Sequence, residues 1–372
     1  MSTPPRAEPE RLATTARSLR KELGVRVTLY ADALAQSLAD DLGLVAWDRE
    51  QLIGGLQQRL RSAVIPQIRR GTGETPLAGC RVLERRTQPL ESIDLAWQKL
   101  CEGLRVHIEH EPGACQAALE LMRGMARLIN DRMGIVVLSV ADDPWTSPPL
   151  DPSASASAFR LAVGLDDPSL WRVVGPARPG PRVAIVESEA DRELAAYVLA
   201  RSSLRRTGLD PRAVKHAYVV GPLDLLRRHM VRLWLSAIMG PATSPGAFAG
   251  PVSPAVRDDY LAAHEAWSSY PEVETWCAGG ELERDGAPVY LAPALFCTPW
   301  PAPELPTSGP MLVVVKCDLR QAQTAAELAA REHGQIIAIG AGLTPYAGQV
   351  TAIRGALLVE RLPPGLPEPR PV

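Results

Sequence analysis

Two glycines near the C-terminus have the spacing of a phosphate-binding turn. The run IAIGAG predicts a buried strand that ends at Gly340 and Gly342. Because glycine has no Cβ, such a turn lets backbone amides approach a pyrophosphate at the start of the next helix. Thr344 would lie in the turn, and Glu360 would lie where an acid binds a ribose hydroxyl. Pro345 occupies the third glycine position, so we favour an ordinary tight turn and predict no cofactor.

Two acids form a second candidate ligand-binding set. The strand-like run VAIVE ends at Glu187, and Asp191 stands where a helix is expected to begin. The carboxyl ends of parallel strands meet at one edge of a sheet, where ligands commonly bind. If Glu187, Asp191 and the glycine turn share that edge, the chain would be an α/β enzyme with a nucleotide or other phosphate-containing ligand.

Arginines recur on two expected helices. Arg201 and Arg205 lie on one helix, and Arg228 and Arg232 lie on the next. Together they could form a basic face that receives phosphate, an acidic protein or nucleic acid. A solvated helix face is the more common explanation, and we favour it.

A metal site and a catalytic nucleophile are not predicted. His107 and His110 are three residues apart on an expected helix, a spacing that can place two imidazoles on one face for zinc. A third ligand is not evident, so a solvated helix end is the favoured interpretation. The GxSxG motif of a serine nucleophile is absent, and we assign no catalytic residue.

Composition excludes several classes of protein. The 372-residue chain has a formal net charge of −2, so it lacks the basic field that favours nucleic acid. No run approaches the ~20 apolar residues of a membrane span, and the N-terminus lacks a signal-peptide core. The six cysteines form no CxxC pair, which favours reduced thiols in the cytoplasm.

The elements that would position these residues fall into two parts. Residues 10–141 show apolar stripes at helical spacing, which predict a helical bundle after a disordered tail at 1–9. Residues 142–157, DDPWTSPPLDPSASAS, predict a linker because prolines and small residues dominate. In residues 158–362 short β-branched runs alternate with helices, which predicts an α/β domain with a mostly parallel sheet, followed by a Pro-rich tail at 363–372.

One segment of the first part resembles a known class. Residues 81–110, RVLERRTQPLESIDLAWQKLCEGLRVHIEH, resemble the helical sensor regions of bacterial regulators of the RsbR and PucR types. The likeness is one of pattern and implies a regulatory role. DNA binding is not implied, because this chain ends in strand-like runs and a Pro-rich tail.

The incomplete motifs lead to one functional expectation with two alternatives. We favour a cytoplasmic regulatory or adaptor protein over an enzyme, and expect it to bind a protein partner or a small ligand. The first alternative is the α/β enzyme described above. The second is a nucleic-acid-associated component that uses the arginine faces.

Overall fold

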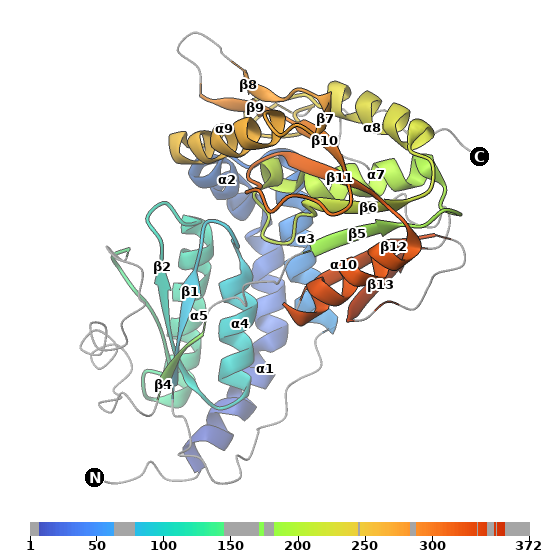
Figure 1. Ribbon diagram of the computed structural model, residues 1–372. Coiled ribbons are helices and arrows are strands. Elements are labelled where there is room, and N and C mark those ends of the chain that lie inside the picture. The colour runs from blue at the N-terminus through green and yellow to red at the C-terminus, as the bar shows by residue number, and fades with distance from the viewer. Residues whose placement is uncertain are drawn as a thin grey trace. The chain divides into compact units, whose positions relative to one another are not determined.

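The chain folds into two compact units. The computed structural model describes residues 7–62, 79–144, 171–174, 182–244, 246–282, 288–332, 334–340, 346 and 348–353. Unit 1 comprises residues 1–42 and 49–177, and unit 2 comprises residues 43–48 and 178–372. Both units contain parallel sheets (Figure 1), so the predicted mixed α/β class with mostly parallel pairing is confirmed.

Unit 1 packs helices on a four-stranded parallel sheet with the order β3-β2-β1-β4. Its helices are α1 (Ala7–Leu29), α2 (Ala31–Leu42), α3 (Ala46–Ser62, whose first residues belong to unit 2), α4 (Glu91–Cys101) and α5 (Gln116–Met133). Its strands are β1 (Gly79–Glu84), β2 (Arg105–His110), β3 (Leu138–Val140) and β4 (Trp171–Val174). Helix α4 contacts β1 and β2, and α1 contacts both α4 and α5.

The predicted N-terminal helical bundle is therefore corrected. The apolar stripe from Ile93 to Ile108 is divided between helix α4 and strand β2. Residues four apart, such as Leu104 and Ile108, lie on one face of a helix and also on one face of a strand, so their spacing does not distinguish the two. The resemblance to a helical sensor region fails for the same reason, because its ends are strands β1 and β2.

Unit 2 is built on a seven-stranded sheet with the order β13-β12-β5-β6-β11-β10-β7. Its strands are β5 (Arg182–Val186), β6 (His216–Val220), β7 (Glu274–Cys277), β10 (Ala294–Pro299), β11 (Met311–Cys317), β12 (Gln335–Ile339) and β13 (Gln349–Ile353). Only β7 is recorded as antiparallel to its neighbour. A separate hairpin pairs β8 (Gly280–Leu282) with β9 (Tyr290–Ala292).

Helices cover both faces of this sheet. Helices α7 (Arg192–Ser203) and α8 (Asp224–Ser236) share one core with Ala184, Val186 and other inward residues. Helices α9 (Pro254–Ser268) and α10 (Leu319–Arg331) pack on the opposite face, where α10 covers Val183 and Ile185. Burial on both faces explains why the strands are continuous apolar runs, and why their alternate residues enter different cores.

Three further predictions from the sequence can be compared with the structure. The helix expected to follow the glycine turn is wrong for residues 349–353, because Gln349–Ile353 is strand β13 in parallel register with β12. The expected tail at 1–9 overlaps α1, which begins at Ala7. Most of the 142–157 linker and all of the 363–372 tail lie outside the described residues.

Among the helices that the structure describes, none is both long and apolar enough to cross a membrane.

Candidate functional site

The carboxyl ends of β5 and β12 form the topological switch point of the unit 2 sheet. The chain runs from β5 to β6 on one side, and later returns to place β12 on the other side of β5. Glu187 and Gly340 follow these strands directly, and the Glu187 amide donates to the Ile339 carbonyl at 2.9 Å. Tyr346 donates its hydroxyl to Glu187 Oε1 at 2.9 Å. Two residues proposed from sequence thus lie side by side where α/β sheets commonly bind ligands.

Asp191 has a structural task near the same edge. Its carboxylate accepts from the amides of Glu193 (2.8 Å) and Leu194 (3.1 Å), so it caps helix α7. The next residue, Arg192, is 9% exposed and donates to the carbonyls of Ser188 and Val220. Sequence reasoning did not select Arg192, and its position just after a capping acid was the available signal.

The geometry at Gly340 does not fit a pyrophosphate. A Cβ on Gly340 would lie 2.4 Å from Glu187 Oε2, so the carboxylate already fills the space that the missing side chain leaves. A phosphate placed there would meet a like charge. The other three residues of the predicted turn, Gly342, Thr344 and Glu360, lie outside the described residues. The cofactor role of this turn stays a prediction.

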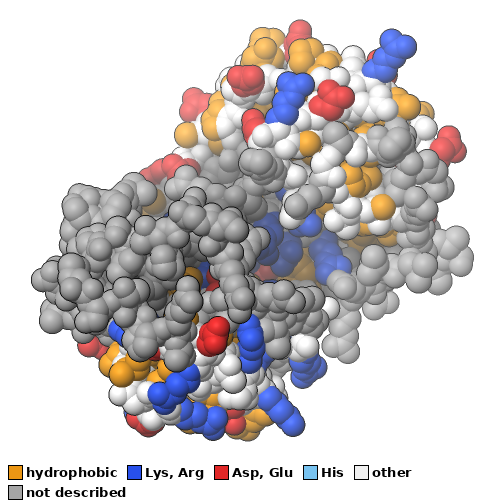
Figure 2. Space-filling view, turned by 90° about the horizontal axis from the view of Figure 1, so that it is seen from below, with side chains coloured by type: hydrophobic (Ala, Val, Ile, Leu, Met, Phe, Trp, Pro, Cys, Tyr) orange, Lys and Arg blue, Asp and Glu red, His pale blue; other side chains and the backbone are white. Residues whose placement is uncertain are grey.

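The arginines predicted to form one basic face have different neighbours. Arg232 pairs with Glu193 at 3.1 Å, and Arg205 lies 3.6 Å from Asp210. Arg228 is exposed on α8, whereas Arg201 is partly buried on α7. Acidic, basic and hydrophobic side chains are interspersed over the described part of the face in Figure 2. The acidic neighbours of Arg205 and Arg232 argue against a single basic face formed by the predicted arginines.

The two histidines considered as a metal-binding pair lie on opposite faces of one strand. His107 and His110 lie on strand β2, where residues three apart point to opposite faces. His107 Nδ1 lies 2.8 Å from the Ser139 hydroxyl, whereas His110 is the register partner of Glu84. The two imidazoles therefore cannot share one metal ion in the way that the helical spacing suggested.

The turn between α7 and β6 is the most strained segment that the structure describes. Three consecutive residues, Arg206, Thr207 and Gly208, have φ angles of 49°, 56° and 71°. A left-handed residue other than glycine costs roughly 1–2 kcal/mol. Close packing holds the turn, because a Cβ on Gly208 would lie 1.9 Å from the Gly309 carbonyl oxygen. Strain of this kind is concentrated at functional sites.

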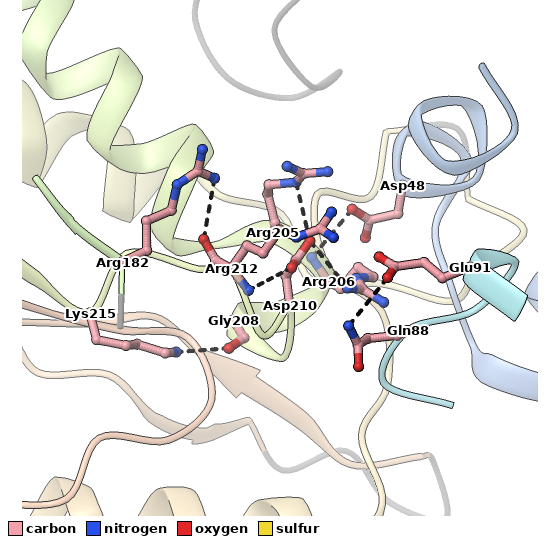
Figure 3. A network of polar contacts seen from close by, with 10 residues as sticks. All are labelled: Asp48, Gln88, Glu91, Arg182, Arg205, Arg206, Gly208, Asp210, Arg212 and Lys215. Carbon is pink, nitrogen blue, oxygen red and sulfur yellow. Dashed lines mark hydrogen bonds and ion pairs between the residues drawn. The ribbon is translucent and has the colours of Figure 1, made fainter. Parts of the chain in front are cut away.

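Buried charges surround this turn, which is shown in Figure 3. The Arg206 amide donates to Asp48 Oδ1 at 3.3 Å, and its guanidinium lies 3.1 Å from Asp210 Oδ2. Lys215 donates to the carbonyls of Gly208 (2.7 Å) and Gly309 (2.5 Å). We call these residues, together with Arg205 and Thr207, the α7–β6 site.

Burial shifts several ionisation equilibria in the α7–β6 site. It raises the pKa of Asp48 to about 7, although the Arg206 guanidinium acts in the opposite direction. For Asp210 burial is again the largest effect, but the guanidinium groups of Arg206 and Arg205 outweigh it and lower the pKa. Burial lowers the pKa of Lys215 to about 8. Groups that titrate near neutrality in a strained, buried turn are candidates for proton transfer.

A short segment from the start of the chain completes this site. Residues 43–48 belong to unit 2, although the chain on either side belongs to unit 1. Trp47 stacks on Phe248 with ring centroids 6.3 Å apart, and a Cβ on Gly250 would lie 2.1 Å from the Gly43 carbonyl oxygen. These contacts place Asp48 beside a turn 158 residues further along the chain. No local pattern predicts such a contact.

The unit 1 sheet has its own switch point, at the carboxyl ends of β1 and β4. Arg85 and Arg86 follow β1, and the Arg86 guanidinium lies over Gly113. Glu84, at the end of β1, accepts a hydrogen bond from the Leu90 amide at 3.1 Å, so its carboxyl group lies at the N-terminus of α4. On the neighbouring strand the buried Nε2 of His110 has no hydrogen-bond partner among the described residues. The two guanidinium groups are donors that suit a phosphate-containing ligand, whereas His110 Nδ1 donates to the Glu111 carbonyl at 3.2 Å, so its Nε2 is an acceptor in the neutral ring.

Cysteine chemistry has little support in this structure. All six cysteines are buried, and none of them forms a disulfide bond in the described structure. Burial raises the pKa of Cys101, Cys115, Cys277 and Cys297 to about 11, and that of Cys317 to about 12. A reactive thiol needs access and a lowered pKa. A covalent thiol intermediate is therefore disfavoured.

The fold is that of aldehyde dehydrogenases. No protein family matches the sequence, and no curated protein is similar to it in sequence. Among solved structures, the NAD-dependent aldehyde dehydrogenase from Sinorhizobium meliloti matches 89% of this chain and 71% of its own, with a TM-score of 0.67 and 16% identity. The lactaldehyde dehydrogenase from Escherichia coli matches 94% and 81%, with a TM-score of 0.66 and 16% identity. The methylmalonate-semialdehyde dehydrogenase from Oceanimonas doudoroffii matches 90% and 74%, with a TM-score of 0.65 and 14% identity.

This likeness corrects the functional expectation. The structures that share the fold over most of the chain are dehydrogenases. The prediction that favoured a regulatory, protein-binding adaptor over an enzyme is therefore wrong. The first alternative, an α/β enzyme with a phosphate-containing ligand, agrees better with this fold.

Proposed function

We propose that the protein is an enzyme that binds a nucleotide cofactor and acts on a small carbonyl compound. The single observation that carries this proposal is the shared fold, because dehydrogenases match 89–94% of the chain. A nicotinamide cofactor, when bound, would accept or donate a hydride. The protein would have to bind its phosphates and manage a proton at the reacting oxygen.

The carboxyl edge of the unit 1 sheet is the proposed cofactor-binding region. Arg85 and Arg86 follow β1 at the switch point, where doubly wound sheets bind nucleotides. The corresponding edge of unit 2 presents the Glu187 carboxylate against Gly340, which suits a hydroxyl or a cation better than a phosphate. The arginine-bearing edge is therefore the better support for an anionic group.

The α7–β6 site is the candidate for proton transfer in unit 2. A carboxyl group with a pKa of about 7, such as that of Asp48, can both take up and release a proton near neutral pH. Because the cysteines are buried, we expect the reaction to proceed without a covalent thiol intermediate.

Binding and turnover measurements test this proposal. Titration calorimetry with NAD and NADP would be followed by an absorbance assay for hydride transfer with a panel of small aldehydes and alcohols. Arg86→Glu should weaken cofactor binding by about tenfold or more, because a charge-assisted contact is lost and reversed. Arg127→Glu, at an exposed arginine on α5, makes the same change in net charge and should leave binding unaltered. An unchanged affinity in Arg86→Glu would refute the proposed location, and no binding with no turnover would refute the function.

Two earlier expectations stay proposals. A cytoplasmic location is supported by the absence of disulfide bonds among the six cysteines, since a reducing compartment disfavours disulfides. A protein partner is also still a prediction, and size measurement of the complex isolated from its host would test it.

A further inference from the structure

A groove of about 600 Å³ lies in unit 1 between helices α1 and α3. Four of its lining residues are basic, and none of the described residues that line it is acidic. The basic residues are Arg17, Arg20, Lys21 and Arg61. Its volume is in the range of small-molecule sites, which is roughly 300–1,000 Å³.

Helical spacing brings these charges together. Arg17, Lys21 and Gly24 are four and three residues apart, so they lie on one face of α1. Gln57 and Arg61, four residues apart, form the facing wall on α3. The opposite face of α1 carries buried residues such as Leu19 and Leu23, so the basic face is turned away from the core.

Contacts with the main chain fix part of the basic wall. Arg17 Nη2 donates to the Cys101 carbonyl at 3.2 Å, and Arg20 Nη2 donates to the Arg59 carbonyl at 3.3 Å. These two hydrogen bonds hold the guanidinium groups of Arg17 and Arg20 in place beside the groove. Lys21 and Arg61 are exposed at the groove. The groove therefore combines two anchored guanidinium groups with two cations that can move onto a ligand.

The floor of the groove is open at Gly24. A Cβ on this residue would meet nothing within 4 Å, so its lack of a side chain leaves empty space. At one end Val25 and Leu29 are 47% and 76% exposed, although both are apolar. A ligand could place charge against the arginines and an organic portion against these two side chains.

We infer that this groove binds a small polyanion that carries two or more phosphate groups. Four cations around one space favour a multiply charged ligand, and phosphate is the anion that guanidinium groups bind in a bidentate manner. The groove volume of about 600 Å³ suits a small molecule, and the formal net charge of −2 argues against nucleic acid. This site lies between helices and is separate from the strand ends proposed to bind the cofactor.

Calorimetry with inorganic tripolyphosphate tests the inference on the full-length chain. The probe has charge but neither base nor ribose, so it separates the groove from a nucleotide site. Lys21→Glu should weaken its binding by about tenfold or more, and raised salt should weaken it in the wild type. Gly24→Leu should block binding by filling the floor. The matched controls are Arg127→Glu, with the same change in charge, and Gly24→Ala, which adds only one methyl group; both should bind as the wild type does.

Each result decides the matter. The inference is supported if Lys21→Glu and Gly24→Leu lose tripolyphosphate binding while both controls and Arg86→Glu retain it. Three results overturn it: no binding by the wild type, equal binding by all the variants, or binding of an oligoglutamate peptide or single-stranded RNA without tripolyphosphate. The cofactor proposal can fail independently, because its diagnostic variant is Arg86→Glu and its readout includes hydride transfer.

Discussion

Replacing Asp48 with Asn should change how the stability of unit 2 depends on pH. Asp48 is 3% exposed, and burial raises its pKa from 3.8 to about 7 in the folded protein. The folded state therefore holds the proton over a range in which the unfolded chain releases it. The resulting stabilisation is complete below pH ~4 and is lost as the pH rises to ~7. The two pKa values differ by about 3, and one pKa unit corresponds to about 1.4 kcal/mol, so the loss is roughly 4 kcal/mol.

Asparagine cannot ionise and resembles the protonated acid in shape. The free energy of unfolding of Asp48→Asn, relative to the wild type, should therefore rise by roughly 4 kcal/mol between pH ~4 and ~7, and stay constant above that. Urea denaturation at a series of pH values measures this difference. Groups that titrate alike in the variant and the wild type contribute equally to both, so their contributions largely cancel. Asp259→Asn, at an exposed carboxylate on α9, is the matched control and should give a curve parallel to the wild type. Parallel curves for Asp48→Asn as well would refute a buried, protonated Asp48. A difference of opposite sign would indicate a native ion pair with Arg206.

Three further predictions rest on packing and access. Gly340→Ala should reduce the free energy of unfolding by about 1–3 kcal/mol in urea, because its Cβ would lie 2.4 Å from Glu187 Oε2; adding Glu187→Ala should restore part of the loss. Gly208→Ala should reduce the free energy of unfolding more than Gly340→Ala does in the same assay. Gly208 has a φ of 71°, and its added Cβ would lie 1.9 Å from the Gly309 carbonyl oxygen; an equal effect would contradict this close approach. Native protein should react with a thiol-alkylating reagent at least ~10-fold more slowly than protein unfolded in urea, and one rapidly labelled cysteine would reopen the thiol route.

The sequence predicts the unit 2 core well, for a physical reason. Strands β5, β11 and β12 are buried on both faces, so each appears as a short β-branched run between turn residues. Helix α10 begins at a capping box formed by Asp318 and Gln321, a start signal that can be read in the sequence. Here the local preference and the tertiary environment favour the same structure.

The unit 1 sheet escapes prediction because its strands carry polar residues inside. Arg81, His107 and Glu109 occupy alternate positions of β1 and β2, and each is at most 8% exposed. Arg81 forms a bidentate ion pair with Glu109 on the neighbouring strand. A buried charge needs such a partner, and the partner lies 28 residues away, so the sequence pattern suggests a solvated segment instead. The arginines that follow β1 were missed for the same reason, since a switch point is defined by strand order.

The α7–β6 site shows why its function was harder to predict than its fold. Three of its features oppose folding: a left-handed turn at two non-glycine residues, a buried Asp48, and a Lys215 amine with a lowered pKa. Each is destabilising alone, and each is held by a segment distant in sequence, at Asp48, Gly250 or Gly309. A turn that only connected a helix to a strand could be made from unstrained residues at lower cost. Strain and buried charge that coincide at one place are therefore better explained by a requirement of function than by one of stability.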